Sequence, residues 1–376
     1  MICILDLGTS KISSILVKDE DTKPEVVAFS SIETSGIKTG SIINIGLISE
    51  DISKSINELE NKSGEKIKDI IVSFSGEQIS SINSTGSVII RQKEVTARDV
   101  QSALNMSSTL KVPNDKTLLY VSPNEYTIDG QPGIAEPIGM NGVRLEARTH
   151  LIYCSQNTKE NISKCIEELN DLRIKKFYFN QLGAAESVLT QDQRDLGVCL
   201  IDIGAGTTDL TVYKGGSIRF SKVFPYAGDY ITETIATSLK ITSTQAEEIK
   251  KKYGCAVLDS DSEDTLRIKG TNGNKEIEIS RKALSEVIEQ SLTRIIRHCA
   301  VCLEDNGMLS YMPTGYVLTG GTANLEGVQK LGEDLTKNNF EIGLPEVEKP
   351  YKSEQLIKPQ FSPILGMIKF CVLERK

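Results

Sequence analysis

The chain lacks tryptophan, has 2 histidines in 376 residues, and carries fewer basic than acidic side chains, 43 against 51. Its net charge of -8 argues against the basic surface that neutralises nucleic-acid phosphates, so we expect no nucleic-acid partner. No apolar run approaches the roughly 18 residues needed to span a bilayer. The segment from Met1 to Asp6 shows no charged leader or cleavage site, which favours a cytoplasmic protein over a secreted one.

The 8 cysteines are scattered without a disulfide framework, a pattern typical of reduced, buried thiols. Cys299 and Cys302 form a single Cys-x-x-Cys. No second pair or histidine at zinc-finger spacing accompanies it. We therefore expect these two thiols to face the core from a helix.

Two segments about two hundred residues apart repeat one another: CILDLG, residues 3–8, and CLIDIG, residues 199–204. Each is followed by a short run rich in strand-forming residues, at 12–17 and 208–213. Each motif predicts a strand, a turn and a second strand. The duplication predicts two similar lobes that face one another.

An aspartate followed by glycines at the end of a strand suits phosphate chemistry. Glycine lets backbone N–H groups approach phosphate oxygens, and the aspartate can hold a hydrated Mg²⁺. A single Asp-x-Gly is as often an ordinary hairpin turn, so the duplication carries the argument. A dinucleotide fold is disfavoured because a strand pattern follows Asp209 where that fold needs a helix, and the chain has no Walker A motif.

Other segments complete the coarse organisation. In GYVLTGGTANLEG a strand at 316–318 runs into Gly320 and Gly321, and we expect a helix from near Asn324. Residues 75–152 read as short strands with one helix, capped at Thr96, and suggest an inserted subdomain. Further predicted elements are helices at 53–62, 159–171 and 280–303, a strand at 68–75, and a hairpin at 265–279. The segment 259–270 imitates a calcium loop but lacks its glycine and its glutamate.

The motifs DLGTSK, LIDIGAGTTDLTVY and LTGGTANLEG occur in the order of the two phosphate loops and the adenosine loop of the actin, sugar-kinase and heat-shock-chaperone ATPase superfamily. Within it the chain resembles the FtsA-like cell-division proteins over nearly its whole length. The resemblance is closest at 186–232 and also covers 124–152. FtsA-like proteins carry an extra subdomain at this place in the chain, whereas MreB-like proteins carry theirs elsewhere.

The resemblance implies an α/β, actin-like fold of two lobes with ribonuclease-H-like subdomains and an FtsA-type insertion. It places the first-lobe core at 1–75, 153–182 and 355–376, the inserted subdomain at 76–152, the second-lobe core at 183–232 and 314–354, and the outer subdomain at 233–313.

It also implies ATP and Mg²⁺ as cofactors, with slow in-line hydrolysis by water as the accompanying activity. Asp6 and Asp202 would hold Mg²⁺ through water, with Asp202 also counted as catalytic, and Gln181 would orient the attacking water. The nucleotide-binding positions are Gly8, Thr9, Ser10, Lys11, Gly204, Ala205, Gly206, Thr207, Thr208, Gly228, Glu247, Lys250, Gly320, Gly321 and Ala323.

The partners implied are other division proteins, further copies in a filament, and the C-terminal tail of the tubulin-like FtsZ at the inner membrane. Arg281, Arg294 and Arg297 would bind that tail, although Ser291 stands where another arginine is usual. Residues 362–376 match the final core helix, not the usual amphipathic membrane helix, so we expect no direct membrane contact. An MreB-like filament protein and a small-molecule kinase are the alternatives.

Overall fold

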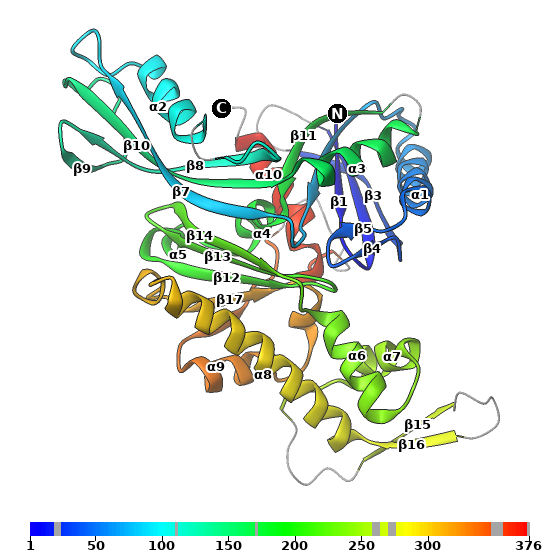
Figure 1. The fold of residues 1–376 in the computed structure, drawn as a ribbon. Coiled ribbons are helices and arrows are strands. Elements are labelled where there is room, and N and C mark those ends of the chain that lie inside the picture. Colours follow the sequence, from blue (N-terminus) through cyan, green and yellow to red (C-terminus); the bar gives the residue numbers. More distant parts are fainter. Residues whose placement is uncertain are drawn as a thin grey trace.

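The computed structural model describes residues 1–18, 24–109, 112–169, 172–257, 264–269, 276–346 and 356–373. It has two lobes, each built on a five-stranded sheet, with a further four-stranded sheet beside the first lobe (Figure 1). The expectation of a two-lobed α/β protein is confirmed.

The two five-stranded sheets have the same topology. In each, the central strand pairs antiparallel with the next strand in sequence and parallel with a later one. The first sheet has the order β11 (Arg173–Phe179), β6 (Asp69–Phe74), β1 (Ile2–Leu7), β2 (Lys11–Lys18), β3 (Glu25–Glu33). Taken from the corresponding edge, the second has the order β18 (Phe340–Ile342), β17 (Tyr316–Thr319), β12 (Val198–Ile203), β13 (Thr208–Lys214), β14 (Ser217–Phe224).

The central strands are buried along their whole length, because both faces of each sheet are covered. The helices of the first lobe are α1 (Ile45–Ser63), α3 (Gln156–Glu167), α4 (Asn180–Val188) and α10 (Ser362–Leu373). The second lobe carries α5 (Gln191–Leu196), α6 (Gly228–Leu239), α7 (Ser243–Tyr253), α8 (Arg281–Asp305) and α9 (Val328–Thr336).

The last described helix, α10, lies in the core, as expected. Ile364, Leu365 and Ile368 are buried, and Val372 is half-buried. The helix packs on α4 at a glycine-to-glycine contact, where a Cβ on Gly366 would collide with the carbonyl of Gly183. This close backbone approach joins the C-terminal helix to the segment that leads from one lobe to the other.

The inserted subdomain folds as a sheet of order β7 (Ser80–Ile89), β10 (Arg144–Ser155), β8 (Lys116–Ile128), β9 (Gln131–Ile134), with α2 (Ala97–Thr109) on one face. Thr96 caps α2, its hydroxyl accepting from the backbone N–H of Asp99 at 3.3 Å. Buried His150 connects this sheet to β14 through Ser221, Nε2 to Oγ 2.8 Å. The subdomain is thus bonded to the second lobe as well as inserted in the first.

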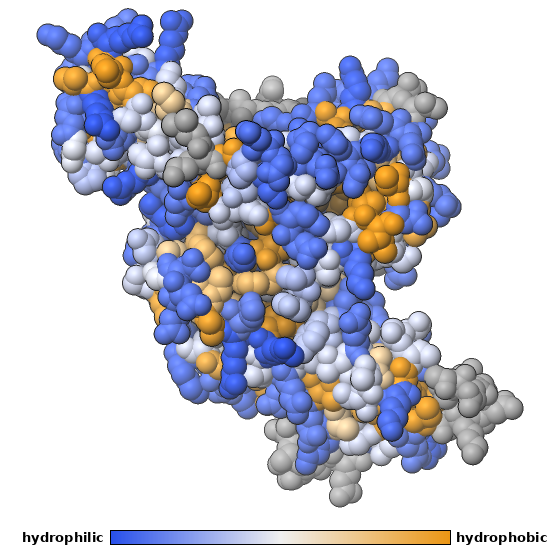
Figure 2. Space-filling view, in the orientation of Figure 1, coloured by the Kyte–Doolittle hydropathy of each residue, from blue (hydrophilic) through white to orange (hydrophobic). Residues whose placement is uncertain are grey.

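The face shown in Figure 2 is largely polar, with scattered apolar groups. The most exposed apolar side chains of the inserted subdomain are Ile89, Val143 and Ile138. Within the described ranges, no helix is both long and apolar enough to cross a bilayer.

One element differs from expectation. The helix expected from near Asn324 begins only at Val328, because Gly321–Asn324 form a 3-10 turn and Gly327 takes a left-handed φ of 77° just before α9.

The hairpin expected at 265–279 is present as β15 (Thr265–Lys269) and β16 (Glu276–Ser280), with its turn outside the described residues. Most of the calcium-loop imitation at 259–270 also lies outside them. The boundaries implied after residues 152, 182 and 232 fall within β10, α4 and α6.

Candidate nucleotide site

The two glycine loops have the same backbone geometry. In the first, the N–H of Gly8 donates to the carbonyl of Lys11 at 3.1 Å. In the second, the N–H of Gly204 donates to the carbonyl of Thr207 at 3.0 Å. Both loops therefore close the same tight turn between antiparallel strands, as the repeated sequence predicts.

The loops face one another across the lobes. A Cβ on Gly206 would collide with the side chain of Thr9 in the opposite loop, and a Cβ on Gly320 would collide with the carboxylate of Asp202. Gly320 also has a left-handed φ of 87°. Because Gly206 and Gly320 have no side chain, the two loops and the Gly320 turn can approach one another closely. We call the concave backbone surface that they form the cradle. Such a cradle suits phosphate oxygens.

Asp6 and Asp202 end the central strands β1 and β12 and are both buried. Burial raises the pKa of Asp6 to about 6. Burial, reinforced by the charges of Asp209 and Asp6, raises the pKa of Asp202 well above its usual value. Lys11 is the nearby cation, and burial lowers its pKa to about 8 against the opposing effect of these carboxylates. Two buried carboxylates of this kind suit a hydrated Mg²⁺.

Asp209 is an acidic residue of the cleft that the sequence analysis did not include among the predicted site residues. It is the direct cross-strand partner of Asp202 in the β12–β13 ladder. Its Oδ1 accepts from Ser75 Oγ at 2.7 Å, and burial raises its pKa to about 7. This pairing could have been predicted from the sequence. Once the turn is placed between Gly204 and Thr207, counting outward along both strands puts Asp209 opposite Asp202.

Gln181 lies on α4 and is fully buried between the lobes. Its amide nitrogen donates to the carbonyl of Asp209 at 3.0 Å, while its Oε1 has no hydrogen-bond partner in the part of the chain that the structure describes. A buried amide oxygen without a partner can accept a hydrogen bond from a water molecule. The position is consistent with orienting water, a role that stays a prediction.

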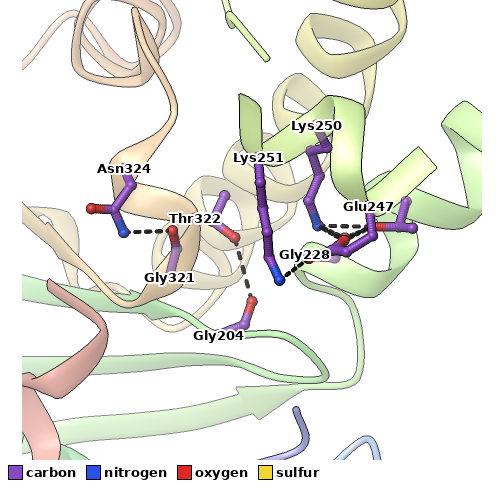
Figure 3. Close-up of polar contacts among 9 residues, drawn as sticks. Gly204, Gly228, Glu247, Lys250, Lys251, Gly321, Thr322 and Asn324 are labelled. Carbon is purple, nitrogen blue, oxygen red and sulfur yellow. Dashed lines mark hydrogen bonds and ion pairs between the residues drawn. The ribbon is translucent and has the colours of Figure 1, made fainter. Parts of the chain in front are cut away.

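Glu247 and Lys250 lie on α7, as the Glu-x-x-Lys spacing predicts, and point toward the start of α6 (Figure 3). Lys250 Nζ contacts Glu247 Oε2 at 2.6 Å, the carbonyl of Gly228 at 2.9 Å and Thr232 Oγ1 at 2.7 Å. Three partners match the three protons of an ammonium group. The lysine therefore holds Gly228 in place, and Glu247 is the more exposed side chain of the pair, 33% against 10%.

The adenosine loop adjoins the second phosphate loop. Thr322 Oγ1 donates to the carbonyl of Gly204 at 3.3 Å, and Asn324 donates to the carbonyl of Gly321 at 2.9 Å (Figure 3). Ala323 is buried, whereas a Cβ on Gly321 would meet open space. The remaining predicted positions, Ser10, Ala205 and Thr208, lie in the two loops or at the start of β13.

Comparison with known proteins now identifies the family. Residues 199–366 match the family model described as cell division protein FtsA, and residues 76–153 match the model of the SHS2 domain inserted in FtsA. The chain is 37% identical to FtsA of Pseudomonas aeruginosa over 347 residues, which cover 92% of this chain and 83% of that protein. It is 31% identical to FtsA of Escherichia coli over 375 residues, covering 97% and 89%. The chain belongs to the FtsA family of cell-division proteins.

Solved structures of the same fold agree with this assignment. The PilM-PilN type IV pilus biogenesis complex matches with a TM-score of 0.70 at 18% identity, over 99% of this chain and 98% of the other. MreB 5 of Spiroplasma citri bound to AMPPNP matches with a TM-score of 0.61 at 14% identity, over 100% and 97%. The actin-like fold with an FtsA-type insertion is therefore confirmed, and FtsA membership decides against the MreB-like alternative.

A second predicted site of this FtsA-family chain lies on α8. Arg294 and Arg297 are exposed, and Arg294 Nη1 donates to the hydroxyl of Tyr230 at 3.1 Å. Arg281 is half-buried between Asp264 and Glu326, with nitrogen-to-oxygen distances of 3.7 and 3.8 Å. Ser291 is buried and donates to the carbonyl of Val287, so an arginine there would enter the core instead of the surface.

Cys299 and Cys302 both pack against the core of the second lobe. Cys299 is buried in the second-lobe core, and burial raises its pKa to about 12. Cys302 is half-buried and packs against the same core. The prediction of core-facing thiols on a helix is confirmed.

Proposed function

We propose that this FtsA-family chain binds ATP with Mg²⁺ between its lobes and serves as an assembly platform in bacterial division. One observation carries the proposal: two turns closed by the same backbone hydrogen bond, one from each lobe, meet at Gly206 and Thr9, and each follows a buried aspartate, Asp6 or Asp202. A binding site shared by both lobes makes their relative position depend on its occupant.

Each group in the cleft has a chemical task under this proposal. Backbone N–H groups of the two loops bind phosphate oxygens, and Lys11 supplies a positive charge. Asp6 and Asp202 would hold Mg²⁺ through water, and that ion would neutralise charge on the phosphates. Gln181 would accept a hydrogen bond from a water molecule and orient it. Hydrolysis of this kind would make the protein a slow ATPase.

Assembly follows from closure of the lobes. Nucleotide that contacts both lobes favours the closed form, because its affinity for that form is greater. We propose that the closed form adds to a filament and links FtsZ to the division machinery at the cytoplasmic face of the inner membrane. The FtsA family membership supports this role, and actin-like relatives such as MamK form a double helical filament.

For the FtsZ tail we propose the arginines of α8 as the binding site. Arg294 and Arg297 lie free of the core at successive turns of the helix, while Arg281 lies at its start. We also propose the subdomain division given above, with the outer subdomain at 233–313 carrying this site.

The nucleotide site is tested by equilibrium binding of a fluorescent ATP analogue to the wild type and to Asp202→Ala, each with and without Mg²⁺. The wild type should bind more tightly with Mg²⁺, and the variant should lose that Mg²⁺ dependence. Absence of binding by the wild type, or unchanged Mg²⁺ dependence in the variant, would overturn the assignment. Phosphoryl transfer from ATP to a sugar or an organic acid would instead support the kinase alternative.

A further inference from the structure

A small hairpin in the first lobe has an unusual backbone. It consists of β4 (Ile37–Lys38) and β5 (Ser41–Ile42), joined by Thr39 and Gly40. Thr39 has a φ of 47° and Gly40 a φ of 76°. A β-branched residue in the left-handed region is strained, and such strain gathers at functional sites. The hairpin tip is therefore a place to look for function.

The tip contacts both phosphate loops. The N–H of Gly40 donates to Thr9 Oγ1 in the first loop at 3.2 Å. A Cβ placed on Gly206 of the second loop would lie 3.0 Å from Thr39 Cα. Thr39 and Gly40 are only half-buried, so a ligand in the cleft can reach them.

The direction of the cleft decides which part of a nucleotide meets the tip. Gly204, at the start of the second loop, is bonded to the adenosine side through Thr322 and Gly228. Gly206, two residues further along, meets Thr9 and Thr39 instead. A nucleotide whose base lies on the Thr322 side thus extends its phosphates toward Gly206. The last phosphate of a triphosphate arrives at the hairpin.

The tip is also held firmly in place. A Cβ on Gly40 would collide with the backbone of Ser75 and Gly76, and the amide of Gln78 donates to the hydroxyl of Ser41. These contacts are mainly to backbone, so a side chain at position 40 has nowhere to go. Only glycine keeps the tip at its present distance from the loops.

We propose that the Thr39–Gly40 tip is a sensor of the terminal phosphate, which makes the cleft prefer ATP to ADP. The Gly40 N–H and the Thr9 hydroxyl form one chain of donors: the N–H donates to Thr9 Oγ1, which leaves the hydroxyl proton for a phosphate oxygen. This inference rests on the proposed nucleotide function. ADP lacks the phosphate that reaches the tip, so its affinity is independent of the hairpin.

The test compares Gly40→Ala with a matched control, Gly64→Ala. Gly64 is in the same lobe and has a similar φ of 73°, but a Cβ there meets nothing within 4 Å. Dissociation constants for ATP and ADP are measured with Mg²⁺ by displacement of a fluorescent nucleotide. We expect Gly40→Ala to weaken ATP about tenfold and ADP less than about twofold. Gly64→Ala should leave the ratio unchanged.

Equal weakening of ATP and ADP in Gly40→Ala, or no weakening, would overturn the sensor while leaving the nucleotide site intact. A wild type that binds neither nucleotide would overturn both. Hydrogen exchange of the wild type, which needs no variant, gives a second readout. Amides of residues 36–42 should exchange more slowly with a non-hydrolysable ATP analogue than with ADP, and equal protection by the two would contradict the proposal.

Discussion

The two glycine motifs share a backbone but differ in charge. Position by position, Lys11 of the first loop corresponds to Thr207 of the second, since each provides the carbonyl that closes its turn. In the ladders, Asp6 is paired with Ser13, whereas Asp202 is paired with Asp209. The first lobe thus brings a cation to the cleft, and the second lobe brings an additional carboxylate.

This difference shows how a duplicated motif acquires two roles. Identical turns suffice to surround phosphates from two sides, because that task belongs to the backbone. Balancing the phosphate charge and activating water need side chains. One cation from the first lobe and one additional carboxylate from the second lobe are enough for these tasks. The asymmetry between the motifs is therefore where chemistry should be sought, and the variants below alter one motif at a time.

The largest effect should come from filling the cradle on one side. Gly206→Val should weaken ATP binding about a hundredfold, roughly 2.7 kcal/mol, because its side chain would occupy the contact with Thr9 and Thr39. The corresponding residue of the first motif, Ser10, is exposed. Ser10→Ala should cost about threefold or less. Equal losses in calorimetric titrations would contradict this placing of the loops.

Removing the cation should have the next largest effect. Lys11→Thr gives the first motif the side chain of the second, and ATP affinity should fall about thirtyfold because a charged hydrogen bond is lost. The control is Thr207→Val, which removes a neutral hydroxyl and should cost about threefold. If both variants bind ATP equally well, Lys11 does not contact the phosphates.

The additional carboxylate should appear in the pH dependence of stability. Burial raises the folded pKa of Asp209 to about 7, above the ordinary aspartate value of 3.8, so between these values the folded state binds more protons than the unfolded state. Its contribution therefore destabilises the nucleotide-free protein above about pH 7 and fades as the pH falls toward 4. Asp209→Ser, which copies the first motif, should flatten the melting temperature between pH 5 and pH 8.

The control for that experiment is Ser13→Ala, which changes the matching position of the first lobe. It should leave the pH profile of melting unchanged, because a hydroxyl does not titrate in this range. A profile for Asp209→Ser that is as steep as that of the wild type would show that Asp209 is ionised normally.

The smallest effect is expected at a position where the two motifs have the same residue. Cys3 and Cys199 occupy matching strand positions, each fully buried in the core of its own lobe. Cys3→Ala and Cys199→Ala should each cost about 1 kcal/mol, a melting-temperature decrease of a few degrees. The two decreases should add in the double variant, since Cys3 and Cys199 belong to different hydrophobic clusters. Strong coupling would mean that the two clusters respond as one at these residues.

Much of the fold could be read from local patterns. The strand, turn and strand of both motifs, the long helix α8 and the hairpin strands β15 and β16 follow from runs of a few residues. Their burial or alternation is decided within each segment. The start of α9 could not be read in this way, because the 3-10 turn after Gly320 is held by contacts with the second phosphate loop.

The candidate site divides along the same line. The residues with the chemistry to bind phosphate could be predicted from the sequence, because glycines and aspartates at strand ends carry that chemistry locally. The folded chain was needed to place Ser75 against Asp209, the ammonium group of Lys250 against Gly228, and Thr39 and Gly40 against the two loops. The contacts of Ser75 with Asp209 and of Thr39 with Gly206 arise where the two lobes meet, whereas Lys250 reaches Gly228 because α7 packs on α6 within one lobe.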